Sequence, residues 1–264
     1  MSAAAAIGSK AARRQPVGPV PLILIARVIR GVADGMMVVG LPIYFTTIGL
    51  NLSQVGVVTT AFQIGTVAAL VWAGRLSRDR GPGLSLMLCS GLMLISALGF
   101  MATRDFGWVI FFALLGAINP MAIDATVFRP LEQGALLETS APSRHPGLIA
   151  AHGFIGQLAG ALGSLVVSAP AVLRSWYGIE VPETIVFALA ALCAFPMFAI
   201  YWRLTRVASA PAANAAPPPL KVPPSNRLRL LLGLFSLDAL AGGLVSNTLL
   251  LVWMHQRFAM PDAV

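Results

Sequence analysis

Apolar runs about as long as a membrane span recur along the chain, separated by short breaks rich in charge, proline or glycine. A bilayer core about 30 Å thick takes about 20 apolar residues of helix. Strands of a membrane barrel would instead alternate polar and apolar residues over about ten positions. Helices are then the remaining way to satisfy the backbone in lipid. We therefore predict an all-α, polytopic transmembrane bundle with seven spans, at 21–45, 53–74, 83–103, 107–127, 147–169, 183–203 and 228–254.

A Pro/Ala-rich stretch, SAPAANAAPPPLKVPPSN, separates the last two predicted spans. Such a composition cannot pack a core and is typical of a linker. The chain then divides into a cytoplasmic tail (1–20), a six-helix transmembrane bundle (21–204), a cytoplasmic linker (205–227) and a seventh span in 228–264. We interpret the last segment as the start of an incomplete second half, and we expect the missing C-terminal half to be needed for activity.

Composition and charge agree with a lipid-embedded chain. Hydrophobic residues make up 57% and charged residues 11%, with mean hydropathy +0.81, whereas soluble domains carry roughly 25% charged residues. The net charge of +8 does not indicate nucleic-acid binding, because the basic residues fall at span ends. With the N-terminus inside, thirteen of the 18 Lys and Arg residues lie on the cytoplasmic side and three on the outer side, as the positive-inside rule expects.

The first predicted span holds three charges, Arg27, Arg30 and Asp34, at a spacing that places them on one helical face. Placing a charge at the middle of a membrane costs free energy, so this face should not be in contact with lipid. Two interpretations stay open. The charges line a path for a solute, or Arg30 and Asp34 form an i, i+4 ion pair that holds the bundle together.

Polar residues in other spans extend this pattern and suggest a shared wet cavity. His152 and Gln157 taken singly are better explained by interhelical hydrogen bonds. If the first and seventh helices are related by an internal repeat, Asp238 matches Arg30 in depth, and the two could pair across the cavity. The candidate transport path consists of Arg30, Asp34, Gln63, Asn119, Asp124, Gln157, Asp238 and Asn247.

Other function classes find less support. Both lysines lie outside the predicted spans, which argues against a retinal protein, and no paired aspartates or Ser/His pair of an intramembrane enzyme is found. We expect no enzyme activity, no cofactor and no metal. A seven-span ligand receptor or a non-transporting membrane protein remains the alternative.

Two segments resemble the major facilitator superfamily. The family's cytoplasmic loop pattern, approximately GxLxDRxGRR, is similar to residues 74–83, although the acid is displaced by one position. The stretch NPMAID, followed by FRPLEQ at the start of the next cytoplasmic loop, resembles a fourth-span signature of one bacterial branch. The resemblance implies that the displaced acid pairs with neighbouring helix ends, with Arg129 as its candidate partner. The loop-motif residues are Gly74, Arg78, Asp79, Gly81 and Arg129.

The resemblance implies a secondary transporter in which two six-helix halves rock about a central site. Its partners would be the lipid bilayer, a small-molecule solute and, if transport is proton-coupled efflux, protons carried by Asp34. It also implies a multi-pass protein of the bacterial inner membrane with a cytoplasmic N-terminus. The chemical identity of the solute is not indicated by the sequence.

Overall fold

The computed structural model describes residues 18–115, 118, 126–169, 176, 182, 184–208, 226–244, 250, 253–254 and 257. The described elements are all helical, as the sequence predicts. They are α1 (Pro19–Thr47), α2 (Leu52–Arg80), α3 (Pro82–Ala102), α4 (Phe106–Leu114), α5 (Phe128–Thr139), the 3₁₀ turn η1 (Pro142–Arg144), α6 (His145–Val166), α8 (Ile185–Ala208) and α9 (Asn226–Leu244).

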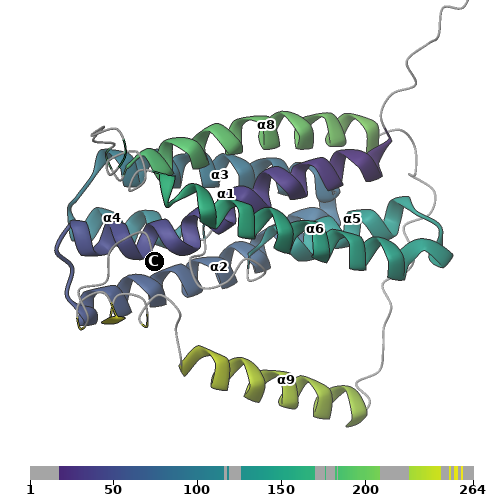
Figure 1. The fold of residues 1–264 in the computed structure, drawn as a ribbon. Coiled ribbons are helices and arrows are strands. Elements are labelled where there is room, and N and C mark those ends of the chain that lie inside the picture. The colour runs from purple at the N-terminus through teal and green to yellow at the C-terminus, as the bar shows by residue number, and fades with distance from the viewer. Residues whose placement is uncertain are drawn as a thin grey trace, which may run out of the picture.

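Helix α1 is the central element of the bundle. It packs along α6 and α8, and α3 packs along α8, so that these helices lie side by side (Figure 1). Helix α2 completes the bundle against α3 and α4. Helix α9 stands apart from the bundle in Figure 1, and every α9 side chain that the structure describes is exposed.

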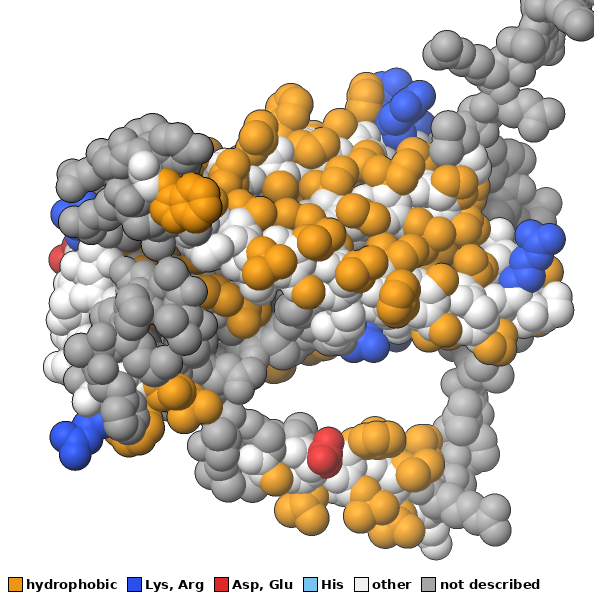
Figure 2. All heavy atoms as spheres, viewed as in Figure 1, with side chains coloured by type: hydrophobic (Ala, Val, Ile, Leu, Met, Phe, Trp, Pro, Cys, Tyr) orange, Lys and Arg blue, Asp and Glu red, His pale blue; other side chains and the backbone are white. Residues whose placement is uncertain are grey.

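Four helical segments among the described residues are long and apolar enough to cross a membrane: Leu52–Arg80, Pro82–Ala102, Pro142–Val166 and Ile185–Arg206. Helix α1 is equally long but carries Arg27, Arg30 and Asp34, which are buried inside the bundle. The outer surface is apolar. Figure 2 shows the middle of one face covered by hydrophobic side chains, with Lys and Arg mostly toward its edges.

Close contact between α1 and α6 depends on glycines in both helices. A Cβ added to Gly35 would lie 1.9 Å from the carbonyl oxygen of Gly160, which no real side chain tolerates. The opposite face of α6 carries Phe154, Leu158 and Leu165, which are 54–69% exposed. One face of α6 therefore packs backbone to backbone, and the other presents apolar side chains to the membrane.

The segment with the loop motif is mostly helical rather than a loop. Helix α2 runs six residues past the predicted end of its span, to Arg80, and α3 begins at Pro82. Gly81 alone joins them, with a φ of 86° that favours glycine. The predicted cytoplasmic loop is thus a one-residue corner, and Gly74, Arg78 and Asp79 lie in the last turns of α2.

The prediction that the fourth span leads directly into a cytoplasmic loop was wrong. Residues 128–139 form α5, whose Phe128, Leu131, Ala135 and Leu136 are buried. These apolar positions recur with helical spacing, and that face packs into the bundle. Most of the predicted span between α4 and α5 lies outside the described residues, as do linker residues 209–225. The first predicted linker residues, 205–208, still belong to α8.

Candidate functional site

Three charged side chains of α1 point into the bundle and not toward the surface. Arg27 and Arg30 are fully buried, and Asp34 is 4% exposed. Their i, i+3, i+7 spacing places them on the face of α1 that meets the other helices. A charge that is desolvated without a partner costs several kcal/mol. Buried charges such as these therefore require neighbouring groups that pair with them.

Arg30 binds two carboxylates from different helices. Its Nε and Nη2 donate to Glu132 Oε1 and Oε2 at 3.2 and 3.0 Å, in the bidentate geometry that suits a guanidinium. Its Nη1 donates to Asp34 Oδ2 at 3.2 Å and to the hydroxyl of Thr126 at 2.6 Å. The sequence-based ion pair between Arg30 and Asp34 is therefore confirmed, and Arg30 has a second acidic partner that the sequence analysis did not find.

Glu132 collects donors from three other helices. Besides Arg30 of α1, Tyr201 of α8 donates its hydroxyl to Oε1 at 2.5 Å, and His152 Nε2 of α6 lies 2.6 Å from Oε2. The carboxylate is fully buried on α5. The predicted interhelical hydrogen bond of His152 is confirmed. We name this group, Arg30, Asp34, Glu132, His152 and Tyr201, the charge cluster.

An aromatic ring and a glycine lie against the two buried arginines. The Arg30 guanidinium lies 5.2 Å from the ring centre of Phe128, close enough for a cation–π contact. Arg27 donates from Nε to the backbone carbonyl of His152 at 3.3 Å. A Cβ on Gly156 would fall within 2.0 Å of the Arg27 guanidinium, so the missing side chain makes room for it.

The formal charges of this buried region cancel when His152 is neutral. Arg27 and Arg30 contribute two positive charges, and Asp34 and Glu132 contribute two negative charges. One further proton on either carboxylate would leave a net positive charge in the interior. His152 Nδ1 is buried and has no hydrogen-bond partner among the described residues.

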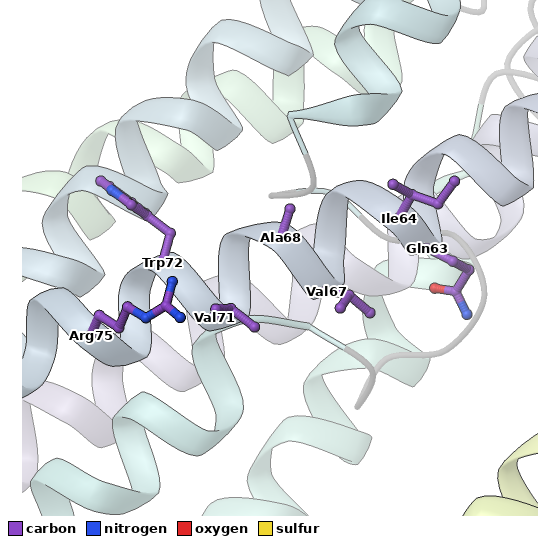
Figure 3. A pocket seen from close by; sticks show the side chains of 7 residues that line it. All are labelled: Gln63, Ile64, Val67, Ala68, Val71, Trp72 and Arg75. Atoms are coloured by element: carbon purple, nitrogen blue, oxygen red, sulfur yellow. The ribbon is translucent and has the colours of Figure 1, made fainter.

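An open hollow of about 620 Å³ lies along the exposed side of α2, and every described residue that lines it belongs to this helix. Its wall includes Gln63 at one end and Arg75 at the other, as Figure 3 shows. The side chains between them are those of Ile64, Val67, Ala68, Val71 and Trp72. This volume lies within the range of about 300–1,000 Å³ that is usual for small-molecule sites. Gln63, predicted to lie on the transport path, is exposed and forms part of this lining.

The remaining predicted path residues are not brought together. Gln157 is exposed on α6, and Asp238 is exposed on α9. The suggested pairing of Arg30 with Asp238 is not formed among the described residues, because Arg30 is engaged by Glu132 and Asp34 inside the bundle. Asn119, Asp124 and Asn247 lie outside the described residues.

In the loop motif, Arg78 and Asp79 are exposed at the end of α2, Gly74 is half-buried, and Gly81 forms the corner. Arg129 is half-buried in the first turn of α5. Among the described residues, no group of three or more His, Cys, Asp or Glu side chains is arranged to hold a metal ion.

Sequence reasoning missed Glu132 and Tyr201 as members of the charge cluster. Glu132 was assigned to a cytoplasmic loop because the stretch FRPLEQ resembles the segment that follows a fourth-span signature of the family. The signal that could have found it is the helical spacing of Phe128, Leu131 and Ala135, which puts residue 132 on the buried side. Tyr201 left a weaker signal, because a tyrosine near the end of a span is also typical of the membrane interface.

Comparison with known proteins agrees with this architecture. Residues 23–262 match the family described as Major Facilitator Superfamily. Over 159 residues, the chain is 23% identical to an uncharacterized membrane protein of Saccharomyces cerevisiae, covering 59% of this chain and 36% of that protein. The chain thus spans about a third of the length of this relative. Because the family match covers most of the sequence, the chain belongs to the major facilitator superfamily.

Proposed function

We propose that this chain forms part of a secondary transporter that moves a small solute across a membrane by alternating access, coupled to protons through the charge cluster. The observation that carries the proposal is Glu132, a buried carboxylate that receives hydrogen bonds from Arg30, His152 and Tyr201. Ionisable groups at membrane depth are costly, and where they persist they commonly mark proton relays or solute paths. Membership in the family supports the transport part of the proposal.

The coupling step follows from the shared use of Arg30. Glu132 and Asp34 both accept hydrogen bonds from the same guanidinium. Protonation of one carboxylate removes its negative charge and leaves Arg30 bound to the other. Since Asp34 lies on the same helix as Arg30 and Glu132 lies on α5, proton binding at Glu132 loosens an interhelical contact. Such a change in contact between two helices would shift the balance between access states.

The test uses the intact transporter in proteoliposomes, with Glu132→Gln, Asp34→Asn and Glu138→Gln as the matched control. Glu138 lies on the same helix but is exposed. We expect Glu132→Gln to abolish accumulation driven by a pH gradient while solute exchange without a gradient persists. Asp34→Asn should weaken accumulation as well, and Glu138→Gln should leave it unchanged. Gradient-driven accumulation that survives both Glu132→Gln and Asp34→Asn would rule out coupling through this cluster.

A further inference from the structure

Of the three side chains that hold the Glu132 carboxylate, His152 is the one that exchanges protons readily. The guanidinium of Arg30 is not deprotonated in proteins. Phenols such as that of Tyr201 ionise only near about pH 10, whereas imidazole gains and loses a proton between about pH 5 and 8. His152 Nε2 lies 2.6 Å from Glu132 Oε2, within reach of direct proton transfer.

The second nitrogen of the His152 ring has no such neighbour. Because Nε2 lies against a carboxylate, which accepts hydrogen bonds, the neutral ring carries its proton on Nε2 and a lone pair on Nδ1. Nδ1 is buried, and no hydrogen-bond partner for it lies within the part of the chain that the structure describes. Buried polar atoms are normally satisfied, so an exception points to a bound water or a functional role. This lone pair can receive a proton while Nε2 gives one to Glu132.

The position of His152 on α6 brings it close to water. It is the first buried residue of α6, counted from the start of the helix. Residues 145–151, which precede it, are exposed or half-buried. Position 152 is seven residues beyond the helix start at His145, about 10 Å along the axis. A few water molecules along this distance are enough to bring a proton to Nδ1.

The charges around the ring decide when a proton can pass. The titratable and charged groups that face His152 and its carboxylate are Arg27, Arg30 and Asp34 of α1, Glu132 of α5 and Tyr201 of α8. Arg30 favours the ionised form of Glu132, and the nearby Arg27 disfavours a lasting positive charge on the ring. A turn of Arg30 toward Asp34, its other partner, therefore leaves Glu132 as the acceptor of an added proton.

We propose that His152 is the proton-relay residue of the charge cluster, through which Glu132 gains and loses the coupling proton. A proton from water binds Nδ1, the proton on Nε2 passes to Glu132 Oε2, and the ring ends neutral with its proton on Nδ1. One N–H bond forms, one N–H bond breaks, and one O–H bond forms on the carboxyl group, which loses its negative charge. Release follows the same steps in reverse. This inference rests on the proposed function, to whose proton it gives a route.

The first test follows both ring nitrogens of wild-type His152, with ¹⁵N-labelled histidine and the chain in phosphatidylcholine nanodiscs. The nitrogen chemical shifts show which ring nitrogen carries a proton, and the variants His145→Gln and His255→Gln leave the His152 signals to be assigned. The pH is lowered stepwise, and the infrared C=O band that Glu132→Gln removes reports protonation of Glu132. We expect the ring proton on Nε2 while Glu132 is ionised and on Nδ1 once Glu132 is protonated. Protons on both nitrogens while Glu132 is still ionised, or a proton that stays on Nε2 throughout, would overturn the proposal.

The second test measures the rate at which Glu132 is protonated, after a light flash releases protons from a caged acid. His152→Gln keeps an N–H group near the position of Nε2 but offers no second nitrogen for uptake. We expect it to slow the rise of the Glu132 band by about a hundredfold, the lower end of the range for a positioned proton transfer. The final amplitude should be unchanged. If His152 only held Glu132 in place, the glutamine amide would do the same and the rate would stay that of the wild type, which would also overturn the proposal.

His145→Gln is the matched control for the rate, because it is the same change at the start of the same helix. His145 Nε2 lies 3.1 Å from the backbone carbonyl oxygen of Ser140. This variant should protonate Glu132 at the wild-type rate. A loss of rate equal to that of His152→Gln would mean that the relay is not specific to His152.

Failure of this inference differs from failure of the proposed function. If gradient-driven accumulation survives Glu132→Gln and Asp34→Asn while the His152 ring still exchanges its proton with Glu132, coupling is refuted and the relay stands. If Glu132→Gln abolishes gradient-driven accumulation but His152→Gln keeps the wild-type rate of protonation, coupling stands and the proton reaches Glu132 by another route.

Discussion

Two clusters join α1 to α8, and they do so by opposite means. In the charge cluster, Arg30 of α1 and Tyr201 of α8 meet through Glu132. In the second, which we call the aromatic cluster (Tyr44, Phe45, Phe62, Phe100, Phe112 and Phe187), Tyr44 of α1 meets Phe187 of α8 with ring centres 4.9 Å apart and nearly perpendicular. The two contacts lie roughly 21 Å apart along either helix, as expected for antiparallel neighbours in one register.

The difference between the clusters is one of tolerance. The charge cluster depends on the identity of atoms, since a buried charge that loses its partner keeps its full desolvation cost. The aromatic cluster depends on shape, because Phe187 also stacks on Phe100 at 5.4 Å and its contribution comes from area and packing. Substitutions in the charge cluster should therefore destabilise the contact between α1 and α8 more than substitutions of similar size in the aromatic cluster.

The largest effect is expected from Glu132→Ala. After this change Arg30 stays buried, and of its two carboxylate partners only Asp34 remains. His152 and Tyr201 lose the carboxylate to which they are hydrogen-bonded. We expect a loss of about 3–5 kcal/mol in the free energy of unfolding, the cost of breaking a buried charge pair. Equilibrium unfolding of the chain in mixed detergent micelles measures it.

The control for this loss is Glu138→Ala, an exposed glutamate on the same helix. It should change the free energy of unfolding by no more than about 0.5 kcal/mol, as most surface substitutions do. Equal stability of the two variants would mean that the charge cluster does not hold the bundle together, and the contrast with the aromatic cluster would disappear.

Near-isosteric changes sharpen the comparison and should have smaller effects. Glu132→Gln keeps the size of the side chain but removes its charge, and we expect a cost of about 1.5–3 kcal/mol from weakened charge-assisted hydrogen bonds. Phe187→Leu keeps an apolar side chain in the aromatic cluster but removes the ring contacts to Tyr44 and Phe100, and we expect a cost of about 1–1.5 kcal/mol. The same unfolding measurement compares them.

Phe195→Leu is the matched control on α8, because Phe195 is 68% exposed and outside the aromatic cluster. It should leave the free energy of unfolding close to that of the wild type. If Phe187→Leu were the more costly of the two near-isosteric changes, ring geometry would matter more than buried charge, and the order of tolerance proposed for the two clusters would be reversed.

The sequence predicts the helices of the bundle better than it predicts the charge cluster. The apolar length of α3 and α8 is enough to place them within a few residues, since a span has few alternatives in lipid. Arg30 and Asp34 were recognised because a charge inside an apolar run is rare. Their spacing on one helix also allowed, as one of two interpretations, the ion pair that the structure contains.

Glu132 could not be found in the same way, because contacts between residues far apart in the chain have no local signature. Arg30 and Glu132 are 102 positions apart, and nothing in either segment states which helix faces which. The aromatic cluster escaped prediction for a related reason. Phe100 and Phe187 are ordinary residues of apolar spans, and only the packing of α3 on α8 shows that they stack.

The smallest effects come from one identical change made in both clusters, the removal of a tyrosine hydroxyl. Tyr201→Phe deletes a hydrogen bond to the Glu132 carboxylate, whereas Tyr44→Phe deletes one to the backbone carbonyl of Thr103. Hydrogen bonds between membrane helices contribute about 0.6 kcal/mol on average and at most about 1.7 kcal/mol. Because the acceptor of the Tyr201 hydroxyl is charged and fully buried, Tyr201→Phe should approach the upper value and Tyr44→Phe should stay near the average.

Unfolding of the two variants and of the double variant measures both losses, which should add because the sites are distant. A larger loss for Tyr44→Phe than for Tyr201→Phe would show that the charge of the Glu132 acceptor adds nothing to the hydrogen bond.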